Sequence, residues 1–453
     1  MTRRSSSNSR GSILIVVLWA SIGLVSIALL FGHSMMLNYR GSDNDLAGRQ
    51  ADAAIEGAIK YAESLLANAE TAGLFPDPTS YEAEAMTVGE ATFWLLGRPE
   101  DPGSGTTREF GLVDEAAKLN LNAFSPQEMQ QILQDFPGMT QEIMDAIVDW
   151  RDPNGTGNSG GGISATTVKH APFESVEELA LVGGMTRQIL YGEDANLNGV
   201  LDTSEDDGDS SLPADNSDGK LDAGLMEYFT VFSREPNVRS DTAAPRVDVR
   251  NPSSQEMADM LAEKFEASRV TQILAPFRAA GGGGPPPSPP PTSPMDFFIR
   301  SGMTADEFDQ IVDLLSTQAA DAPYIVGRVN VNTASEVVLS HVPGLDVNSA
   351  AALVSARLSN PPQTTSIAWV RDAIGDPAAT VAGRYITGQS FQASVDVAAV
   401  GRHGRGYRRE RVVIDTSDAE KGPRVIYRRN LAPLGWALGR DVRENLALKK
   451  DVR

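Results

Sequence analysis

The chain has 453 residues, which is enough for two or three domains with sizeable cores, and it contains no cysteine, which excludes disulfides and thiolate metal sites. Its formal net charge of −21, from 60 acidic and 39 basic residues, disfavours a general affinity for nucleic acid. The charge is uneven, because residues 401–453 hold 14 Lys and Arg against 7 Asp and Glu, a net of +7, which leaves −28 for the first 400 residues.

The N-terminus combines a short basic leader with a long apolar run. The leader carries Arg3, Arg4 and Arg10, and residues 13–31 contain no charged side chain. A helix of that length rises about 1.5 Å per residue and nearly crosses a hydrocarbon core of about 30 Å. The run is longer than the apolar region of a secretory signal, and no small-residue cleavage site follows it. The positive-inside rule places the leader in the cytoplasm and the chain after Arg40 outside, so a single-pass anchor is the simplest interpretation.

Helical periodicity continues past the membrane face, in Ala-rich sequence that extends to about Glu70. Gly11 stands directly between the basic leader and the apolar run. A helix that is apolar in its first half and amphipathic in its second, followed by a globular region, resembles a type IV pilin or pseudopilin. The resemblance implies that prepilin peptidase cuts between Gly11 and Ser12, that the new N-terminus is methylated, and that the apolar helix is kept.

Val16 departs from the usual pilin pattern. Most pilins and pseudopilins carry Glu at the fifth mature position, which is Val16 when the count starts at Ser12. A carboxylate inside a bilayer is costly unless it is paired, and in assembling pilins the partner is taken to be the N-terminal amine of the adjacent subunit. A subunit with nothing ahead of it has no such partner, so Val16 fits the leading place in a filament. An ordinary membrane anchor would also carry an apolar residue there.

Strand-like sequence occurs at both ends of the region outside the membrane. An aromatic, β-rich run covers residues 86–97, and a second run covers residues 108–122. Helical patterns then dominate to about residue 385. Strand patterns return in three segments, at residues 390–400, 407–416 and 424–430. This order predicts an α+β fold, in which a small antiparallel sheet domain carries a large helical insertion.

Several segments have biased composition. Residues 281–294 are Gly-rich and then Pro-rich, which is typical of a flexible and then stiff linker, and residues 152–167 are a second candidate for disorder. Residues 401–412 carry many arginines. They fit a solvated β-hairpin better than a basic patch for anionic lipid or an acidic partner.

Three segments of the helical middle share one plan, at residues 118–133, 246–261 and 328–342. Each has a short alternating strand-like start, a small polar residue able to cap a helix, and a helix with apolar positions three and four apart. In the first and third segments a Pro-Gly turn leads to a second helix, which we expect Thr140 and Asp346 to cap.

Residues 172–190 form a similar helical hairpin without the strand. These hairpins resemble the helix-hairpin-helix class, which in many proteins presents backbone amides to a DNA phosphate. Such a role needs basic residues near the turns, because phosphate contacts dominate affinity. The turns here are flanked by acids such as Asp135, Glu142 and Asp346. A compact helical packing module is therefore favoured over DNA binding.

Residues 193–227 form an acidic loop with 11 Asp and Glu and a single Lys. Acid-rich segments are often disordered, but the spacing here matches the calcium loop D-x-[DN]-x-[DN]-G-x5-E, with Gly199 at the turn. Ca²⁺ prefers six to eight oxygen ligands, and such a loop curls them around one point. The sequence therefore predicts a structural Ca²⁺ site. Its ligand positions 1, 3, 5, 7, 9 and 12 fall on Asp194, Asn196, Asn198, Val200 (through its carbonyl), Asp202 and Glu205.

A second, partial copy of the calcium loop follows. Asn216, Asp218 and Asp222 fall at positions 3, 5 and 9. Position 1 is Ala214 and position 12 is Leu225, so Asp215 or a neighbouring acid would have to substitute. The sequence leaves open whether a second ion binds.

The combined order of these features resembles protein K, the minor pseudopilin family of type II secretion systems, over nearly the whole chain. Its components include the capped hairpins "LNLN" and "VNVNTAS", the segment "PFESVEEL", the acidic loop and the late "YRRNLAPLGWALG". The resemblance implies a role at the pseudopilus tip, initiating or capping the filament and supporting export across the outer membrane, and it implies calcium in the helical domain.

The same resemblance implies the partners and the location. The implied partners are the minor pseudopilins I and J, the major pseudopilin and the prepilin peptidase, and no nucleic acid is expected. The implied location is the inner membrane, crossed once, with the N-terminus cytoplasmic and the bulk of the chain periplasmic. The Pro-rich linker, the Gly-rich insert near Gly160 and the basic C-terminal tail depart from the family pattern.

The expected organisation divides the chain into six parts: a leader (1–11), the pilin helix (12–70), the first part of the sheet domain (71–118), the helical insertion (119–385), the C-terminal strands (386–439) and a basic tail (440–453). No catalytic constellation emerges, because the four histidines are scattered and no nucleophile motif appears, so an enzyme is not expected. The alternatives are a type IV pilus minor pilin or assembly factor and a membrane-anchored helix-hairpin-helix DNA-uptake protein.

Overall fold

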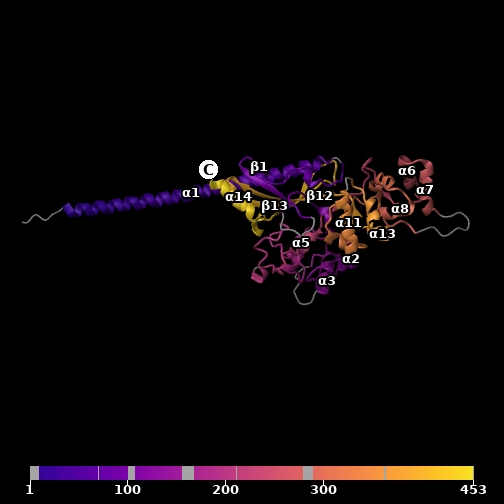
Figure 1. Cartoon of the computed structure of the whole chain (residues 1–453), viewed down its shortest axis with the longest axis horizontal. Helices are drawn as coiled ribbons and strands as arrows, with labels where there is room; N and C mark the ends of the chain where they lie inside the picture. Colours follow the sequence, from indigo (N-terminus) through magenta and orange to yellow (C-terminus); the bar gives the residue numbers. More distant parts are fainter. Residues whose placement is uncertain are drawn as a thin grey trace, which may run out of the picture.

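The computed structural model describes residues 10–69, 71–99, 108–155, 168–210, 212–278, 289–361 and 364–451. One long helix, α1 (Arg10–Ala67), projects from one end of the body, as Figure 1 shows. The predicted leader before residue 10, residues 281–288 of the predicted linker and residues 156–167 of the Gly-rich segment lie outside the described residues.

Helix α1 has two halves with opposite surroundings. Apolar side chains from Ile13 to Tyr39 are exposed, while Ala47 and the residues that follow it on the same face are buried. Among the described residues, α1 is the helix that is long and apolar enough to cross a membrane. The helix predicted to reach about Glu70 ends at Ala67. The apolar half is therefore available to a membrane, and the second half belongs to the body.

A six-stranded antiparallel sheet joins the two ends of the region that follows α1. Its main path is β1-β2-β12-β13-β14, and β3 also pairs with β12. The strands are β1 (Met86–Val88), β2 (Ala91–Leu96), β3 (Val113–Asp114), β12 (Gln392–Gly401), β13 (Arg405–Asp415) and β14 (Arg424–Asn430). Because β2 and β12 are neighbours, the segment between them is an insertion into the sheet domain, and the predicted α+β fold is confirmed.

The three C-terminal strands begin and end within two residues of the predicted bounds. The predicted β-rich run at residues 108–122 is different, because it forms only β3 and the two-residue strand β4 (Leu119–Asn120). Between them the Asp114 side chain accepts the N–H of Ala116 and turns the chain into a 3₁₀ helix. A side chain that competes for backbone donors ends a strand in this way.

One face of the sheet is covered by the second half of α1. Ala51, Ala54, Ala58 and Ala62 are fully buried against strand residues such as Val395. Alanine has no bulk beyond Cβ, so the helix axis can lie close to the strands. Charge pairs supplement this packing.

The basic stretch predicted as a solvated hairpin is instead paired with acids of α1. Asp43 pairs with Arg402 and Arg405, and Asp52 pairs with Arg408 at 2.8 Å. On β14, Arg428 likewise pairs with Glu56 of α1 at 2.5 Å. Exposed pairs of this kind are each worth well under about 1 kcal/mol, so they orient the helix more than they stabilise it.

The insertion is built from three structural repeats. Each repeat begins with a two-residue strand, continues through two helical hairpins, and ends in a two-residue strand that pairs in parallel with the first. Repeat 1 covers residues 119–230, repeat 2 covers residues 247–316, and repeat 3 covers residues 329–387. In Figure 1, helices α6 to α8 of repeat 2 lie at the end of the body farthest from the projecting part of α1.

The elements of repeat 1 are β4, α2 (Pro126–Leu133), α3 (Gln141–Arg151), the 3₁₀ helix η4 (Val176–Leu181), α4 (Arg187–Tyr191), α5 (Leu225–Tyr228) and β5 (Phe229–Thr230). Those of repeat 2 are β7 (Val247–Asp248), α6 (Gln255–Lys264), α7 (Ala267–Leu274), α8 (Pro294–Ser301), α9 (Ala305–Asp309) and β8 (Leu315–Ser316). Those of repeat 3 are β10 (Val329–Asn330), α10 (Glu336–Ser340), α11 (Val347–Ser359), α12 (Trp369–Ile374), α13 (Asp376–Ala382) and β11 (Ile386–Thr387). Outside the repeats, β6 (Arg234–Pro236) pairs with β9 (Tyr324–Val326), and α14 (Gly439–Asp451) ends the described chain.

The same short hydrogen bonds recur at the start of every repeat. The side chains of Asn120, Asp248 and Asn330 each accept the N–H of the residue two positions later, at 2.9, 2.9 and 3.0 Å. This turn sends the chain from the strand into the first capped helix, and the predicted caps Thr140 and Asp346 both accept an N–H of the second helix. The shared plan predicted from sequence is therefore confirmed.

Candidate metal centre

The acidic loop lies between α4 and α5 of repeat 1, and its two ends meet. Gly192 and Ala223 form an isolated antiparallel bridge. Gly192 has φ +61°, and a Cβ atom at this position would lie 2.0 Å from the carbonyl oxygen of Asp222. Glycine is therefore required where the two ends of the loop meet. Residues 192–223 thus form a closed loop that leaves and rejoins the helical repeat at one point.

The first predicted calcium loop is curled around its own side chains. The carboxylate of Asp194 accepts the N–H groups of Asn198 at 3.0 Å and Gly199 at 2.8 Å. The carboxylate of Glu205 accepts the N–H groups of Asn196 and Asp202 at 3.2 and 3.1 Å. The loop thus brings residues 1 and 12 of the calcium pattern into one small volume.

Most predicted ligands of this loop are buried, and one buried oxygen has no partner. Asp194, Asn196, Asn198 and Glu205 are between 1 and 7 % exposed. The amide groups of Asn196 and Asn198 both donate to Asp202. The Oδ1 atom of Asn196 is buried without a hydrogen-bond partner among the described residues. A buried polar oxygen without a donor is costly, and a hard cation would satisfy it.

The charge balance in the loop also favours a cation. Burial, together with the nearby Asp194 and Asp202 carboxylates, raises the pKa of Glu205 to about 8. Burial likewise raises the pKa of Asp194, although Arg98 opposes this effect. Like charges in a dry site disfavour ionisation, and a divalent ion would remove that penalty. These donors therefore fit Ca²⁺.

Carboxylates alone would not hold the ion. Among the described residues, no three His, Cys, Asp or Glu side chains are grouped closely enough for a metal. A site here depends on the amide oxygens of Asn196 and Asn198 and on the carbonyl of Val200 as well. Mixed carboxylate, amide and carbonyl ligands are the usual set for calcium in such loops.

The second loop has a partner that sequence reasoning missed. The buried Glu193 accepts the N–H groups of Asn216 at 3.0 Å and Asp222 at 2.9 Å. These are positions 3 and 9 of the partial loop, and Glu205 has the same role at positions 3 and 9 of the first loop. Asp215, the predicted substitute, instead accepts the N–H of Ser217 at 2.8 Å. Glu193 lies outside the second pattern, so only the folded loop reveals it.

The N-terminal candidates lie at the free end of α1. Val16 is exposed and belongs to the helix. Gly11 and Ser12 are helical in their backbone, while their side-chain surroundings lie outside the described residues. The structure brings none of these three residues near the acidic loop.

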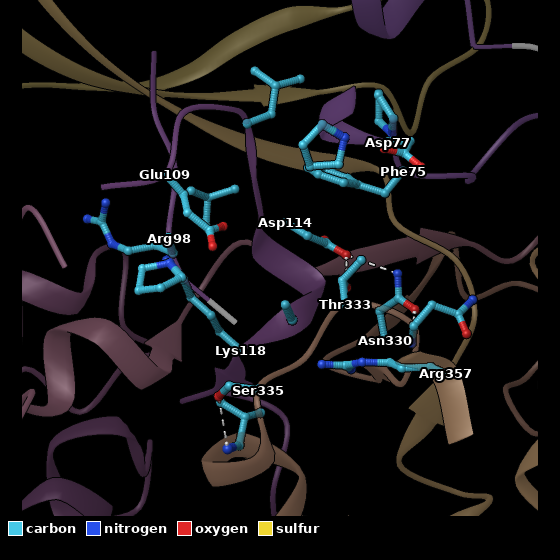
Figure 2. A pocket seen from close by; sticks show the side chains of 18 of the residues that line it. Phe75, Asp77, Arg98, Glu109, Asp114, Lys118, Asn330, Thr333, Ser335 and Arg357 are labelled. Atoms are coloured by element: carbon cyan, nitrogen blue, oxygen red, sulfur yellow. Dashed lines mark hydrogen bonds between the residues drawn. The ribbon is translucent and has the colours of Figure 1, made fainter. Parts of the chain in front are cut away.

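A separate cavity of about 410 Å³ lies where the sheet domain meets repeats 1 and 3. Figure 2 shows Asp114 at its centre, with Asn330 and Thr333 on the repeat 3 side and hydrogen bonds joining them to Asp114. Arg98 and Lys118 lie toward the opposite side. None of the predicted processing or metal residues is among its described lining, so the cavity is a separate feature.

In two of the hairpins, the side chain that caps the second helix occupies one of its first N–H groups. The Thr140 side chain accepts the N–H of Ile143, and the Asp346 side chain accepts the N–H of Ser349 at 2.8 Å. Acids such as Asp135, Glu142 and Asp346 flank these turns, and acidic turns disfavour contact with a DNA phosphate.

The body defines a class of protein in outline: a membrane-length apolar helix whose second half lies on an antiparallel sheet, with a helical insertion. No protein-family model matches the chain, and no curated protein matches it. Among solved structures, the chain is similar to a chain in the crystal structure of the GspK-GspI-GspJ complex from the type 2 secretion system of enterotoxigenic Escherichia coli. The two chains share 10% identity, the alignment covers 87% of this chain and 99% of that chain, and the TM-score is 0.36. At these values the likeness by itself establishes neither fold nor function.

Proposed function

We propose that this protein is a minor pseudopilin of a type II secretion system. The observation that carries the proposal is the division of α1, whose apolar first half is exposed and whose second half is buried on the sheet. A single-pass anchor needs only the first half. A helix that continues unbroken from the membrane into the body is what a filament subunit needs, because its exposed half can exchange lipid for neighbouring helices.

The proposed place is the tip of the pseudopilus, where the protein initiates or caps the filament. Val16 has no carboxylate that would need the N-terminal amine of a neighbouring subunit as its partner. Its side chain is exposed, so it can face lipid or a neighbouring helix. The repeats lie beside and beyond the sheet, away from the projecting helix (Figure 1), where they would obstruct a subunit added above.

Processing provides the first test. Intact mass and N-terminal analysis of the membrane-extracted protein should show a chain that begins at methylated Ser12. Retention of Met1–Gly11 would remove the pseudopilin proposal and leave an ordinary anchor.

Assembly provides the second test. The full chain, extracted in mild detergent with calcium, should co-purify with the minor pseudopilins I and J. The Val16→Glu variant adds an acid with no partner at the tip, so we expect secretion to fall while the membrane level of the protein is kept. Unchanged secretion in that variant would contradict the leading position. Co-purification with the minor pilins of a type IV pilus would indicate the alternative machine.

We also propose that the first loop binds Ca²⁺ as a structural ion. Asp194, Asn196, Asn198, Asp202 and Glu205 would hold it with their side chains, and Val200 with its carbonyl. A bound ion would neutralise the buried carboxylates and pair the free Asn196 oxygen. For the partial second loop, Asn216, Asp218 and Asp222 are candidates together with Glu193.

Calorimetry tests the calcium proposal. The wild-type chain should bind at least one Ca²⁺, and Glu205→Gln should lose that binding because the bidentate ligand is gone. Asp206→Asn is the matched control, since Asp206 is an exposed acid of the same loop outside the ligand positions. Equal loss in both variants would indicate a general effect of charge rather than a site.

A further inference from the structure

We propose that the first calcium loop is a latch, by which we mean that it attaches repeat 1 to the face of the sheet opposite α1. Three arginines of the sheet domain bind the loop there. The latch rests on the calcium proposal above, and it assigns a role to Arg98, Arg409 and Arg411. These residues contact backbone carbonyls of the loop.

The contact converges on one backbone oxygen. The carbonyl of Leu197 accepts hydrogen bonds from Arg98 at 2.8 Å, Arg409 at 2.7 Å and Arg411 at 3.1 Å. Arg409 also donates to the carbonyl of Asn196. Leu197 has φ +57°, a left-handed conformation within the curl, and its carbonyl faces the arginines. The curl that gathers the ligands is therefore the same curl that presents this oxygen to the sheet.

The three arginines come from the sheet domain; two are fixed within it, and the third also pairs with repeat 1. Arg409 and Arg411 lie on β13 and pair with Asp396 of β12 at 2.7 and 2.8 Å. Arg98 follows β2 and pairs with Glu227 of α5 at 2.9 Å. The fully buried Arg409 would lose two of its acceptors if the loop moved away. Its hydrogen bonds to Asp396 would remain, but the loss of two acceptors for a buried guanidinium is unfavourable, so the arginines favour the curled form of the loop.

A second set of contacts fastens the same loop at its side. Arg108 pairs with Asp202 at 2.7 Å, and the Asn198 amide donates to the carbonyl of Ala437 at 3.1 Å. Both partners belong to the sheet domain. Thus two candidate ligands of the ion also touch the body on which the loop is seated.

Without a cation, the loop has a reason to open. The Oδ1 atom of Asn196 is then buried without a partner among the described residues, and Asp194 and Glu205 are buried acids of the same curl, so the curl is costly. Repeat 1 has other attachments, such as Arg429 to Glu177 at 2.5 Å. Calcium removal should therefore loosen this one joint without releasing the repeat.

Coupling of this kind is reciprocal: if the ion favours the latched state, then weakening the arginine side must weaken ion binding by the same factor. The test uses the full chain in detergent and the variants Arg98→Lys and Arg411→Lys. These variants keep the net positive charge and remove the planar fork of donors that the Leu197 carbonyl and its neighbours accept. Arg424→Lys on the edge strand β14, where the arginine pairs with Asp415 away from the loop, is the control.

We expect the Kd for Ca²⁺, measured by calorimetry, to rise about fivefold or more in the double variant Arg98→Lys/Arg411→Lys and to stay unchanged in Arg424→Lys. Hydrogen exchange in wild type should accelerate at residues 194–202 and 436–438 when calcium is chelated, while β14 is unaffected. If the wild type binds calcium and the double variant binds it equally well, the latch is wrong and the calcium site stands. If the wild type binds no calcium, both fail.

Discussion

At the scale of single residues, Asp114 and Glu115 are neighbouring carboxylates that hold different parts of the molecule. Asp114 accepts hydrogen bonds from Asn330 and Thr333 of repeat 3. Glu115 accepts hydrogen bonds from Thr230 of repeat 1 and from Ser394 of β12. Both carboxylates are nearly inaccessible to solvent. Asp114 thereby joins the sheet to the first strand of repeat 3, and Glu115 joins it to the last strand of repeat 1.

The two carboxylates should respond to pH in opposite directions. Burial raises the pKa of Asp114 to about 6, from 3.8 when unfolded, so its contribution to stability is full below about pH 4 and is lost as the pH rises through 6. For Glu115, burial is outweighed by Lys118 and by hydroxyl donors, so its pKa is lowered and its contribution is lost as the pH falls.

Thermal unfolding of wild type and of Asp114→Asn between pH 4.5 and 7 measures the first effect. The advantage of wild type over this variant should shrink as the pH rises, by about 3 kcal/mol at most. The advantage of wild type over Glu115→Gln should grow over the same range. A constant difference for both variants would mean that neither group titrates differently on folding.

At the scale of elements, one arginine in each of two repeats closes the first hairpin. Arg151 of α3 donates to the carbonyls of Leu121 and Phe124. Arg357 of α11 donates to the carbonyls of Val331 and Ala334, the matching positions of repeat 3. The second helix of the hairpin thus holds the turn that leads into the first helix.

Replacing either arginine with methionine should destabilise the protein by about 2–3 kcal/mol, because buried carbonyls lose a charged donor. Arg371→Met is the control, since Arg371 lies in α12 and makes a partly exposed pair with Asp376. The measurement is the midpoint of thermal unfolding. A similar midpoint for Arg357→Met and for the control would contradict the proposed role of Arg357 in holding the turn.

The connection between the two hairpins differs in length among the repeats. It covers residues 152–175 in repeat 1, residues 278–293 in repeat 2 and residues 360–368 in repeat 3. The Gly- and Pro-rich segment predicted as a linker between parts of the insertion is therefore a connection inside repeat 2. Removal of residues 281–287 would give the connection of repeat 2 the same length as the connection of repeat 3.

That deletion should change stability by less than about 1 kcal/mol, because the entropy of closing a loop depends only weakly on its length. Circular dichroism melting of the deletion variant checks this, with a deletion of residues 255–261 from α6 as the disruptive control. A large loss in the first variant would show that the segment is more than a connection.

Sequence patterns predicted the helices and strands that show a regular hydrophobic periodicity. They missed the contacts between residues far apart in the sequence, which leave no periodic pattern. The long C-terminal strands and the helix caps Thr140 and Asp346 followed from local residues alone. The closing strands of the repeats have only two residues each, too few to show an alternation. Glu193 and the arginines at Leu197 act across the fold, and their sequence spacing carries no trace of the partner.

At the scale of the whole molecule, the distribution of charge follows the way the body is assembled. Arginines of β13 and β14 meet acids from α1 and from β12, and two of them also donate to backbone carbonyls of the acidic loop. These arginines of the basic C-terminal region thereby face acids of a body that is otherwise strongly acidic. Opposite charges brought together from distant segments favour this arrangement of the domains over others.

Chelation of calcium should lower the thermal midpoint of the full chain. An ion present at a hundred times its Kd adds about 2.7 kcal/mol to the stability of the state that binds it. Wild type in detergent with calcium should therefore melt higher than with chelator, and Glu205→Gln should melt alike in both. Magnesium at the same concentration is the control ion. An equal shift in the Glu205→Gln variant would place the ion elsewhere.

The unbroken course of α1 has a mechanical consequence. Its 58 residues contain no proline, and at about 1.5 Å per residue they form a rod of roughly 87 Å. About half of that rod is fixed along β12 and β13 by small side chains and charge pairs. A force or torque applied to the exposed apolar half of α1 would therefore act directly on these strands. The body and the exposed half of α1 should therefore move as one rigid unit.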